Sequence, residues 1–135
     1  MDAATIQKET YTMKFASVRI VTEDVAALAG FYQCITGVKP VGTEDFVELR
    51  TAGAVLAICS RRSVDRDNAG AALARANQSV ILEFEVADVD AERERLDTEA
   101  IVWVLEPTTQ PWGNRSMLFR DPDGNLVNVY APPTR

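Results

Sequence analysis

The chain carries the same succession of strand and helix signals twice, and this internal repeat limits the possible folds more than any other feature. Residues 15–37 begin with alternating apolar side chains, which predict a strand, and continue with a helical pattern that Asp24 can cap and Gly37 can end. Residues 79–99 follow the same plan, with Asp88 as the cap. When the two caps are aligned, two more residues are identical: Val25 with Val89, and Ala27 with Ala91.

The two halves also end alike. Residues 46–60 predict strand, turn and strand around Gly53. Residues 115–130 predict the same around Gly124, so the two glycines correspond to each other in the repeat. The Asp-Pro-Asp-Gly run that contains Gly124 is a strong turn signal between two strands. A hairpin therefore closes each half.

Each half is predicted to have the order strand, helix and three strands, abbreviated βαβββ. Residues 100–107 supply the middle strand of the second half, and its counterpart near residues 38–41 is short. The connection between the halves has a charged start and an Ala-rich middle, which predict a short helix. The expected organisation is a single α+β domain over residues 1–135, with modules at about 13–60 and 79–132 joined by a linker at 61–78.

The charge of the chain narrows the range of partners. Twenty acidic and 14 basic residues give a net charge of −6, which disfavours nucleic-acid binding because that requires a basic face. An acidic excess suits a cationic ligand, and it equally serves solubility. No apolar run is long enough to span a membrane, and the polar residues 1–12 lack the order of a signal peptide. A cytoplasmic protein without membrane contact is expected.

Histidine is absent from the chain, which removes the commonest general base and the commonest transition-metal ligand together. Cys34 falls in a helical pattern and Cys59 in an apolar strand, and their spacing matches no metal motif. Both are predicted to be packing thiols, because a catalytic thiol usually needs a neighbouring base.

Alternation along the predicted strands separates two faces of the sheet. Apolar side chains are expected to lie under the helices: Val18, Ile20, Leu82, Phe84, Val127 and Val129. The opposite face mixes polar and apolar side chains: Ser17, Arg19, Val55, Ala57, Cys59, Ile81, Glu83, Glu85, Leu126, Asn128 and Tyr130. This second face either meets water or lines a cup that encloses a ligand.

Three stretches resemble one family. WGNRSMLFRDPDGNLVNVY at 112–130 is similar to the C-terminal hairpin of the glyoxalase / bleomycin resistance / dioxygenase superfamily, also called the vicinal oxygen chelate superfamily. VTEDVAALAGFYQCITGV at 21–38 resembles its first helix, and FEVADVDAERERL at 84–96 its second-half helix entry. The resemblance covers about residues 14–132. It implies a glyoxalase-like fold, in which two βαβββ modules form a curved mixed sheet and an open cup, usually completed in a homodimer.

Enzymes of this superfamily hold one divalent metal in the cup, and the resemblance assigns its ligands to Ser17, Ala57, Ile81 and Asn128. None of these is a histidine or a carboxylate, the ligands that a catalytic divalent centre requires. No metal and no cofactor are therefore expected. A shift of one or two residues in this assignment would bring in Glu83 or Glu85, which together could hold a hard cation loosely.

A metal-free branch of the superfamily binds cationic or aromatic antibiotics in a dimer cleft, and the resemblance therefore implies a small-molecule binding protein. Aromatic and acidic side chains are the expected contacts. The candidate ligand-binding residues are Arg19, Phe46, Glu48, Glu83, Glu85, Trp112, Asn128 and Tyr130. Tyr32 and Trp103 are expected in the core, and Arg19 is expected to pair with Glu83 or Glu85.

Two alternatives remain open. The first is an enzyme of the lyase, dioxygenase or isomerase type that uses another metal site, or uses Glu83 or Glu85 as a base with Arg19 stabilising an oxyanion. The second is a dimeric subunit that regulates another protein. A cup without a cleft able to hold a ligand would favour the regulatory subunit.

Overall fold

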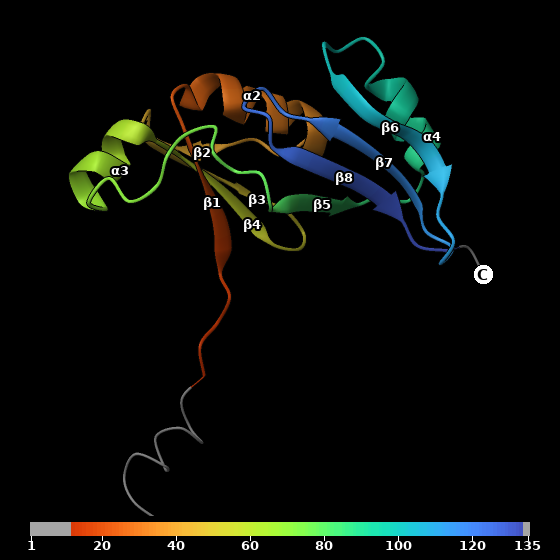
Figure 1. The fold of residues 1–135 in the computed structure, drawn as a ribbon, viewed down its shortest axis with the longest axis horizontal. Coiled ribbons are helices and arrows are strands. Elements are labelled where there is room, and N and C mark those ends of the chain that lie inside the picture. Colours follow the sequence, from red (N-terminus) through yellow and green to blue (C-terminus); the bar gives the residue numbers. More distant parts are fainter. Residues whose placement is uncertain (1–11, 134–135) are drawn as a thin grey trace, which may run out of the picture.

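The computed structural model describes residues 12–133 as two four-stranded mixed sheets, each with a helix on one face (Figure 1). The first sheet has the order β1-β4-β3-β2 and the second β5-β8-β7-β6. The elements are β1 (Ser17–Thr22), α2 (Val25–Thr36), β2 (Val41–Gly42), β3 (Phe46–Arg50), β4 (Val55–Ser60), α3 (Arg61–Asp67), β5 (Ile81–Glu85), α4 (Val89–Arg95), β6 (Val102–Thr109), β7 (Arg115–Arg120) and β8 (Leu126–Ala131). The predicted βαβββ order and fold class are confirmed. The predicted polar segment 1–12 lies outside the described residues, except for Thr12.

Strand pairing is the same in the two modules, and it agrees with the alignment of the two halves of the sequence. β1 is parallel to β4 and pairs Ser17 with Val55. β5 is parallel to β8 and pairs Ile81 with Leu126. The alignment of the helix caps matches Ser17 to Ile81, and the alignment of the hairpin glycines matches Val55 to Leu126. The two modules are therefore repeats of one structural unit.

Both predicted helix caps are present. The Asp24 side chain accepts a hydrogen bond from the Ala27 amide (3.0 Å), and Gly37 ends α2 in the left-handed conformation at φ 72°. Helix α4 ends at Arg95, whereas the sequence pattern extended to about Glu99. The last four residues are held by turns instead, because Leu96 is the last apolar side chain that anchors this segment in the core.

The linker carries the short helix that its composition predicted. α3 occupies the charged start, where Ser60 caps it by accepting a hydrogen bond from the Ser63 amide (3.0 Å). The Ala-rich residues 71–76 form no helix. A capping serine and a buried Val64 stabilise the first segment, and the second has neither.

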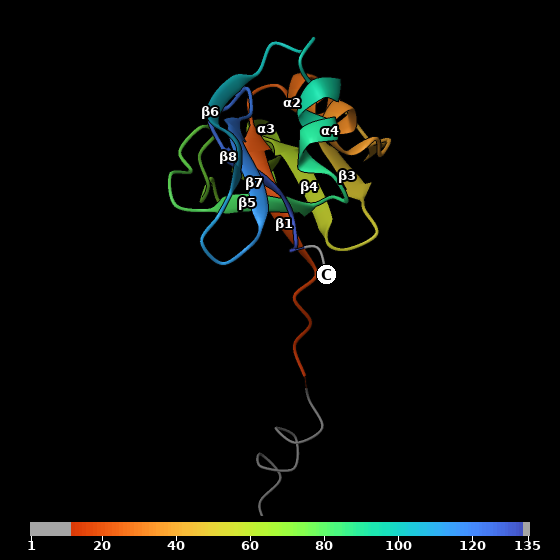
Figure 2. The same ribbon diagram turned by 90° about the vertical axis from the view of Figure 1, so that its right-hand side faces the viewer.

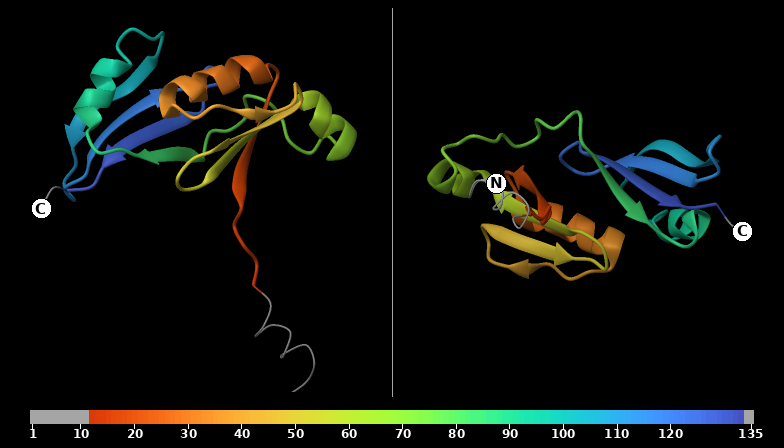
Figure 3. Two further views of the ribbon diagram at one scale, coloured as in Figure 1. Left: turned by 180° about the vertical axis from the view of Figure 1, so that it is seen from behind. Right: turned by 90° about the horizontal axis from the view of Figure 1, so that it is seen from below.

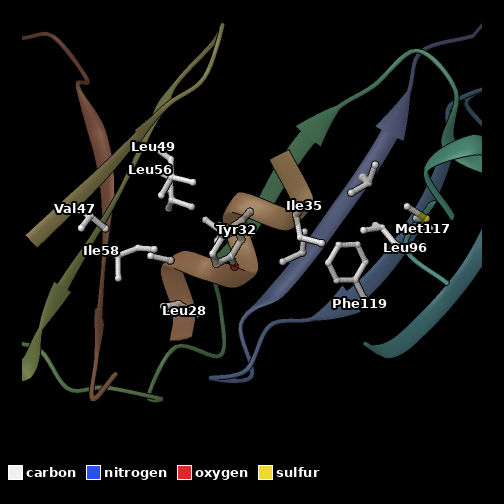
Figure 4. Close-up of a cluster of buried hydrophobic side chains, with 14 of the residues drawn as sticks. Leu28, Tyr32, Ile35, Val47, Leu49, Leu56, Ile58, Leu96, Met117 and Phe119 are labelled. Atoms are coloured by element: carbon white, nitrogen blue, oxygen red, sulfur yellow. The ribbon is translucent and has the colours of Figure 1, made fainter. Parts of the chain in front are cut away.

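One hydrophobic core extends across both modules (Figure 4). α2 contributes Leu28, Tyr32 and Ile35, which pack between the two sheets. The predicted helix-facing side chains are confirmed: Leu82, Val127 and Val129 are buried, and the other three, Val18, Ile20 and Phe84, pack against the same core cluster. Because neither sheet covers its own apolar face completely, the modules depend on each other for stability.

A buried polar network at the Asp121 turn joins the modules. The Tyr32 hydroxyl on α2 donates to Asp121 Oδ2 (2.6 Å). The same carboxylate accepts from the amides of Asp123 and Asn125 (both 2.9 Å) and from Asn125 Nδ2 (2.7 Å). Asn77 at the end of the linker donates to Asn125 Oδ1 (3.0 Å). The Asp-Pro-Asp-Gly-Asn motif thus sets the hairpin and also anchors the second sheet to the first helix.

We expect this network to make the free energy of unfolding fall as the pH rises into the alkaline range. Burial, and then the neighbouring Asp121 carboxylate, raise the pKa of the Tyr32 hydroxyl above its ordinary value. The unfolded chain ionises this hydroxyl above about pH 10 while the folded chain keeps the proton, so stability falls with rising pH by up to about 1.4 kcal/mol per pH unit. In urea unfolding at pH 8 and pH 11, Tyr32→Phe should lose less stability between the two pH values than the wild type. If both proteins lost the same free energy of unfolding between pH 8 and pH 11, the Tyr32 hydroxyl would not be the cause of the pH dependence.

Within residues 12–133, no helix is long and apolar enough to cross a membrane.

Candidate functional site

The four side chains at the expected metal positions lie on the sheet faces turned away from α2 and α4. They form two equivalent pairs, Ser17 with Ala57 and Ile81 with Asn128, each diagonal across a parallel strand pair. Ala57 is 2% exposed and Ile81 47% exposed. Two alkyl groups, one hydroxyl and one amide do not fit a catalytic divalent metal, which needs imidazole or carboxylate ligands.

The rest of the described chain offers no substitute set. Among residues 12–133, no three acidic or cysteine side chains gather closely enough to hold a metal ion. Cys59 is fully buried, as predicted, while Cys34 is half-buried. Burial raises the pKa of the Cys34 thiol, and Glu99 raises it further. A thiol held protonated in this way is a weak nucleophile.

Asn128 is bonded to Glu83 on this face of the second sheet. The two residues are neighbours in the β5–β8 register, and Asn128 Nδ2 donates to Glu83 Oε1 (3.2 Å). The carboxylate determines which way the amide points, because the reverse orientation would bring two oxygens together. Asn128 Oδ1 is buried and has no donor among the described residues. The pair therefore offers acceptors on Glu83 and on Asn128 Oδ1, together with the second Nδ2–H of Asn128.

The predicted pairing of Arg19 with Glu83 or Glu85 is wrong. Arg19 Nη2 instead donates to Asn68 Oδ1 (3.0 Å), just after α3. Helix α3 lies on the same face of the first sheet, where its Val64 packs on two strand side chains, Val21 and Cys59. The linker therefore covers part of the first module's cup and holds Arg19 there.

A cleft of about 1150 Å³ lies between the modules. One wall is the end of the first module: the C-terminus of α2, the turn at 51–54 and the start of β4. The other wall is all of β5, with neighbouring parts of α4 and β8. Most lining side chains are apolar, and Glu83 and Glu85 are the carboxylates that β5 adds. Figure 3 shows β5 at the edge of its sheet, next to the first module.

No arginine or lysine among residues 12–133 pairs with Glu83 or Glu85. Within the described part of the chain, the one polar contact of these two carboxylates is the hydrogen bond from the Asn128 amide to Glu83. Both carboxylates are exposed to solvent and stand beside an apolar wall, so a ligand cation can reach them directly.

The predicted ligand-binding residues lie in three places: at the cleft, on the first sheet and in the β6–β7 loop. Glu83, Glu85 and Tyr130 line the cleft, and Asn128 is joined to it through Glu83. The others lie apart from the cleft: Arg19, Phe46 and Glu48 on the first sheet, and Trp112 in the β6–β7 loop. Glu48 is paired with Arg50 (3.0 Å), and Trp112 is 68% exposed.

Arg95 is a cleft residue that the sequence pattern did not indicate. It reaches from α4 to the end of α2, where its guanidinium donates to the carbonyls of Cys34 (2.9 Å) and Ile35 (2.8 Å). The same side chain pairs with Glu92. Arg95 caps α2 from the other module, and this contact depends on how the modules pack, so no local motif announces it.

A second depression of about 520 Å³ lies beside α4 and is less suited to a ligand. Both arginines that line it already pair with carboxylates: Arg115 with Asp90 (2.8 Å) and Arg93 with Glu106 (2.7 Å). Arg115 holds the pKa of Asp90 below its usual range, and Arg93 does the same for Glu106. The cleft is therefore the candidate functional site.

Comparison with known proteins supports the assignment of the fold. Among solved structures, a glyoxalase/bleomycin resistance protein/dioxygenase from Nocardioides is 20% identical, with 96% of this chain and 91% of that chain covered at a TM-score of 0.75. A family enzyme from Burkholderia phytofirmans is 16% identical, covering 88% and 98% at a TM-score of 0.76. A lactoylglutathione lyase from Agrobacterium tumefaciens is 22% identical, covering 89% and 94% at a TM-score of 0.69.

The search of curated proteins gave no match. The family model of the glyoxalase/bleomycin resistance protein/dioxygenase superfamily matches residues 14–129, which span both modules. This match agrees with the repeat, the hairpin motif and the strand order described above. The chain belongs to the glyoxalase/bleomycin resistance protein/dioxygenase superfamily.

Proposed function

We propose that the chain is a small-molecule binding protein that takes an aromatic or other largely apolar cation into the cleft between its modules. The observation that carries this proposal is the pair of carboxylates, Glu83 and Glu85, which have no cationic partner among the described residues and stand beside apolar walls. An apolar body would gain from burial against these walls, and its charge would gain from the carboxylates.

The site offers further contacts to such a ligand. Tyr130 lines the cleft and presents an aromatic face, which attracts a cation through its ring quadrupole. A cleft of about 1150 Å³ exceeds the space that a typical small ligand fills. The side chains at the superfamily's metal positions supply no competent ligand set, so binding is proposed to proceed without a metal.

Titration with thioflavin T, a fluorescent aromatic cation, tests this proposal. We expect saturable binding that Glu83→Gln and Glu85→Gln each weaken by about tenfold, because each substitution removes one charge–charge contact. Glu44→Gln is the matched control, since it removes an exposed carboxylate remote from the cleft. The aromatic anion 8-anilinonaphthalene-1-sulfonate should bind more weakly than thioflavin T. Glu83→Gln should reduce this difference in affinity between the two dyes.

Two results would count against the proposal. Equal losses in Glu44→Gln and Glu83→Gln would mean that the dye senses only net charge. Loss of thioflavin T binding on addition of EDTA would mean that a metal is needed, as in the enzymes of the superfamily.

A further inference from the structure

Helix α3 covers one end of the first sheet, on the face turned away from α2. It lies at the end of the molecule away from the second sheet (Figure 1), and in Figure 2 the linker that follows it (green) passes outside the strands. Beneath α3, Val21 and Cys59 are buried and pack against Val64 of the helix. This small cluster is separate from the core that joins the modules.

Packing alone holds α3 weakly. Among its seven residues Val64 is the one apolar side chain, and a helix of this length is not stable by itself. Ion pairs to two loops of the first module supply further attachment. Arg62 pairs with Asp45 before β3 (2.8 Å), and Arg61 pairs with Glu23 after β1 (3.2 Å).

These ion pairs are exposed to solvent. The side chains of Arg61 and Glu23 are 51% and 58% exposed, and that of Arg62 is 67% exposed. Exposed pairs of this kind contribute little each, and dissolved salt screens them. The attachment of α3 can therefore be released without unfolding the sheet beneath it.

The chain on both sides of α3 allows the helix to move. Before it, Ser60 is both the last residue of β4 and the helix cap, so the junction is a single residue. After it, residues 69–76 are mostly exposed, and Asn77 is anchored to Asn125 (3.0 Å). Eight residues span up to about 26 Å when extended. This segment is long enough to follow α3 away from the sheet.

We propose that α3 is a lid, held shut mainly by its ion pairs, that opens at the Ser60 junction and uncovers a row of side chains across the first sheet. The row consists of Val21, Cys59 and Phe46, which are neighbours in the strand register. Opening also releases Arg19 from Asn68, its hydrogen-bond partner after α3 (3.0 Å). This inference concerns the first module alone and goes beyond ligand binding in the cleft between the modules.

Thiol labelling measures the opening, because the buried Cys59 can react only when α3 lifts or the chain unfolds. The substitution Cys34→Ser leaves Cys59 as the one thiol of the chain. The reagent is 4,4′-dithiodipyridine, which is uncharged and therefore does not respond to the net charge of the protein. We expect Cys59 to react in the native chain, at a rate set by the fraction of open lid.

A matched pair of substitutions tests the ion pairs. In the Cys34→Ser background, Arg62→Gln should raise the labelling rate about fivefold, because it removes the pair with Asp45. Arg66→Gln is the control: it makes the same change of charge on the same helix, but Arg66 pairs with Asp67 of α3 itself (2.8 Å). The control should leave the labelling rate unchanged.

Phe119→Ala separates lid opening from global unfolding. Phe119 lies in the core that joins the modules and not in the cluster under α3. If Cys59 reacts through lid opening, this substitution should change the labelling rate by less than about twofold, whereas reaction through global unfolding would raise the rate more than about 100-fold. Labelling of the Cys34→Ser chain in low concentrations of urea makes the same distinction without the core substitution: lid opening exposes little surface, so the rate should stay nearly constant.

Sodium chloride at about 1 M should raise the labelling rate at least threefold, and should raise it less in Arg61→Gln/Arg62→Gln, because the screened pairs are absent there. Three outcomes would overturn the proposal. These are a labelling rate that follows global stability, equal rates in Arg62→Gln and Arg66→Gln, and a rate that does not respond to salt. None of these measurements contains a ligand, so they stand or fall separately from thioflavin T binding.

Discussion

Asp121→Ala is expected to lower the free energy of unfolding by about 3–5 kcal/mol, because it removes the acceptor of several buried hydrogen bonds at once. The Asp121 carboxylate accepts from the Tyr32 hydroxyl, from the Asn125 side chain and from two backbone amides. An alanine leaves these donors without their acceptor, and all but the half-buried Asp123 amide are in buried positions. Urea unfolding followed by circular dichroism measures the loss.

The conservative variant Asp121→Asn separates hydrogen bonding from packing. An asparagine keeps the shape and one oxygen, so the amides of Asp123 and Asn125 keep an acceptor, whereas the Asn125 side chain meets an amide nitrogen. We expect a loss intermediate between the wild type and Asp121→Ala. In a double-mutant cycle, Tyr32→Phe should cost less stability in the Asp121→Ala background than in the wild type. Additive losses would show that the two groups do not interact.

Phe119→Ala is expected to destabilise the chain by about 3–5 kcal/mol through loss of buried area and creation of a cavity. Phe119 is fully buried and packs edge-on against Trp103, with ring centroids 5.3 Å apart, and against Phe31 of the other module at 6.2 Å. Phe46→Ala makes the same substitution at a site that is 37% exposed, and it should lower the free energy of unfolding much less. Similar losses at the two sites would contradict a core shared by both modules.

The shared core also predicts how the chain unfolds. Because α2 packs between both sheets, loss of Phe119 should lower the stability of the first module as well as the second. A single unfolding transition by circular dichroism and by Trp103 fluorescence would agree with this prediction. Trp112 fluorescence must first be removed by Trp112→Phe, a substitution at an exposed loop position.

Much of the fold could be predicted because its signals are local. The caps Asp24 and Asp88 and the turn before Gly124 act on their own neighbours, and each lies where the pattern indicated. Strand alternation also separated the two sheet faces correctly, since a half-buried strand has a period of two residues. It therefore identified Glu83 and Glu85 as residues of the face opposite the helices.

Other features depend on contacts between distant segments. The partner of Arg19 is Asn68, because α3 folds over the first sheet, and nothing near Arg19 in sequence indicates this. Arg95 looked like one of several charges on a polar helix, yet it caps α2 of the other module. Trp112 looked suited to stacking on a ligand, but its loop lies outside the cleft.

The amino-acid sequence is enough to predict the repeat, the βαβββ modules, the superfamily and the absence of competent ligands at the four metal positions. These properties follow from residue identity and short-range spacing. The position of the cleft, the residues that line it and the place of the edge strand β5 along it follow instead from contacts between distant segments. The physical reason is that a cleft is the space left between packed modules, and this space is set by long-range contacts such as Tyr32 with Asp121.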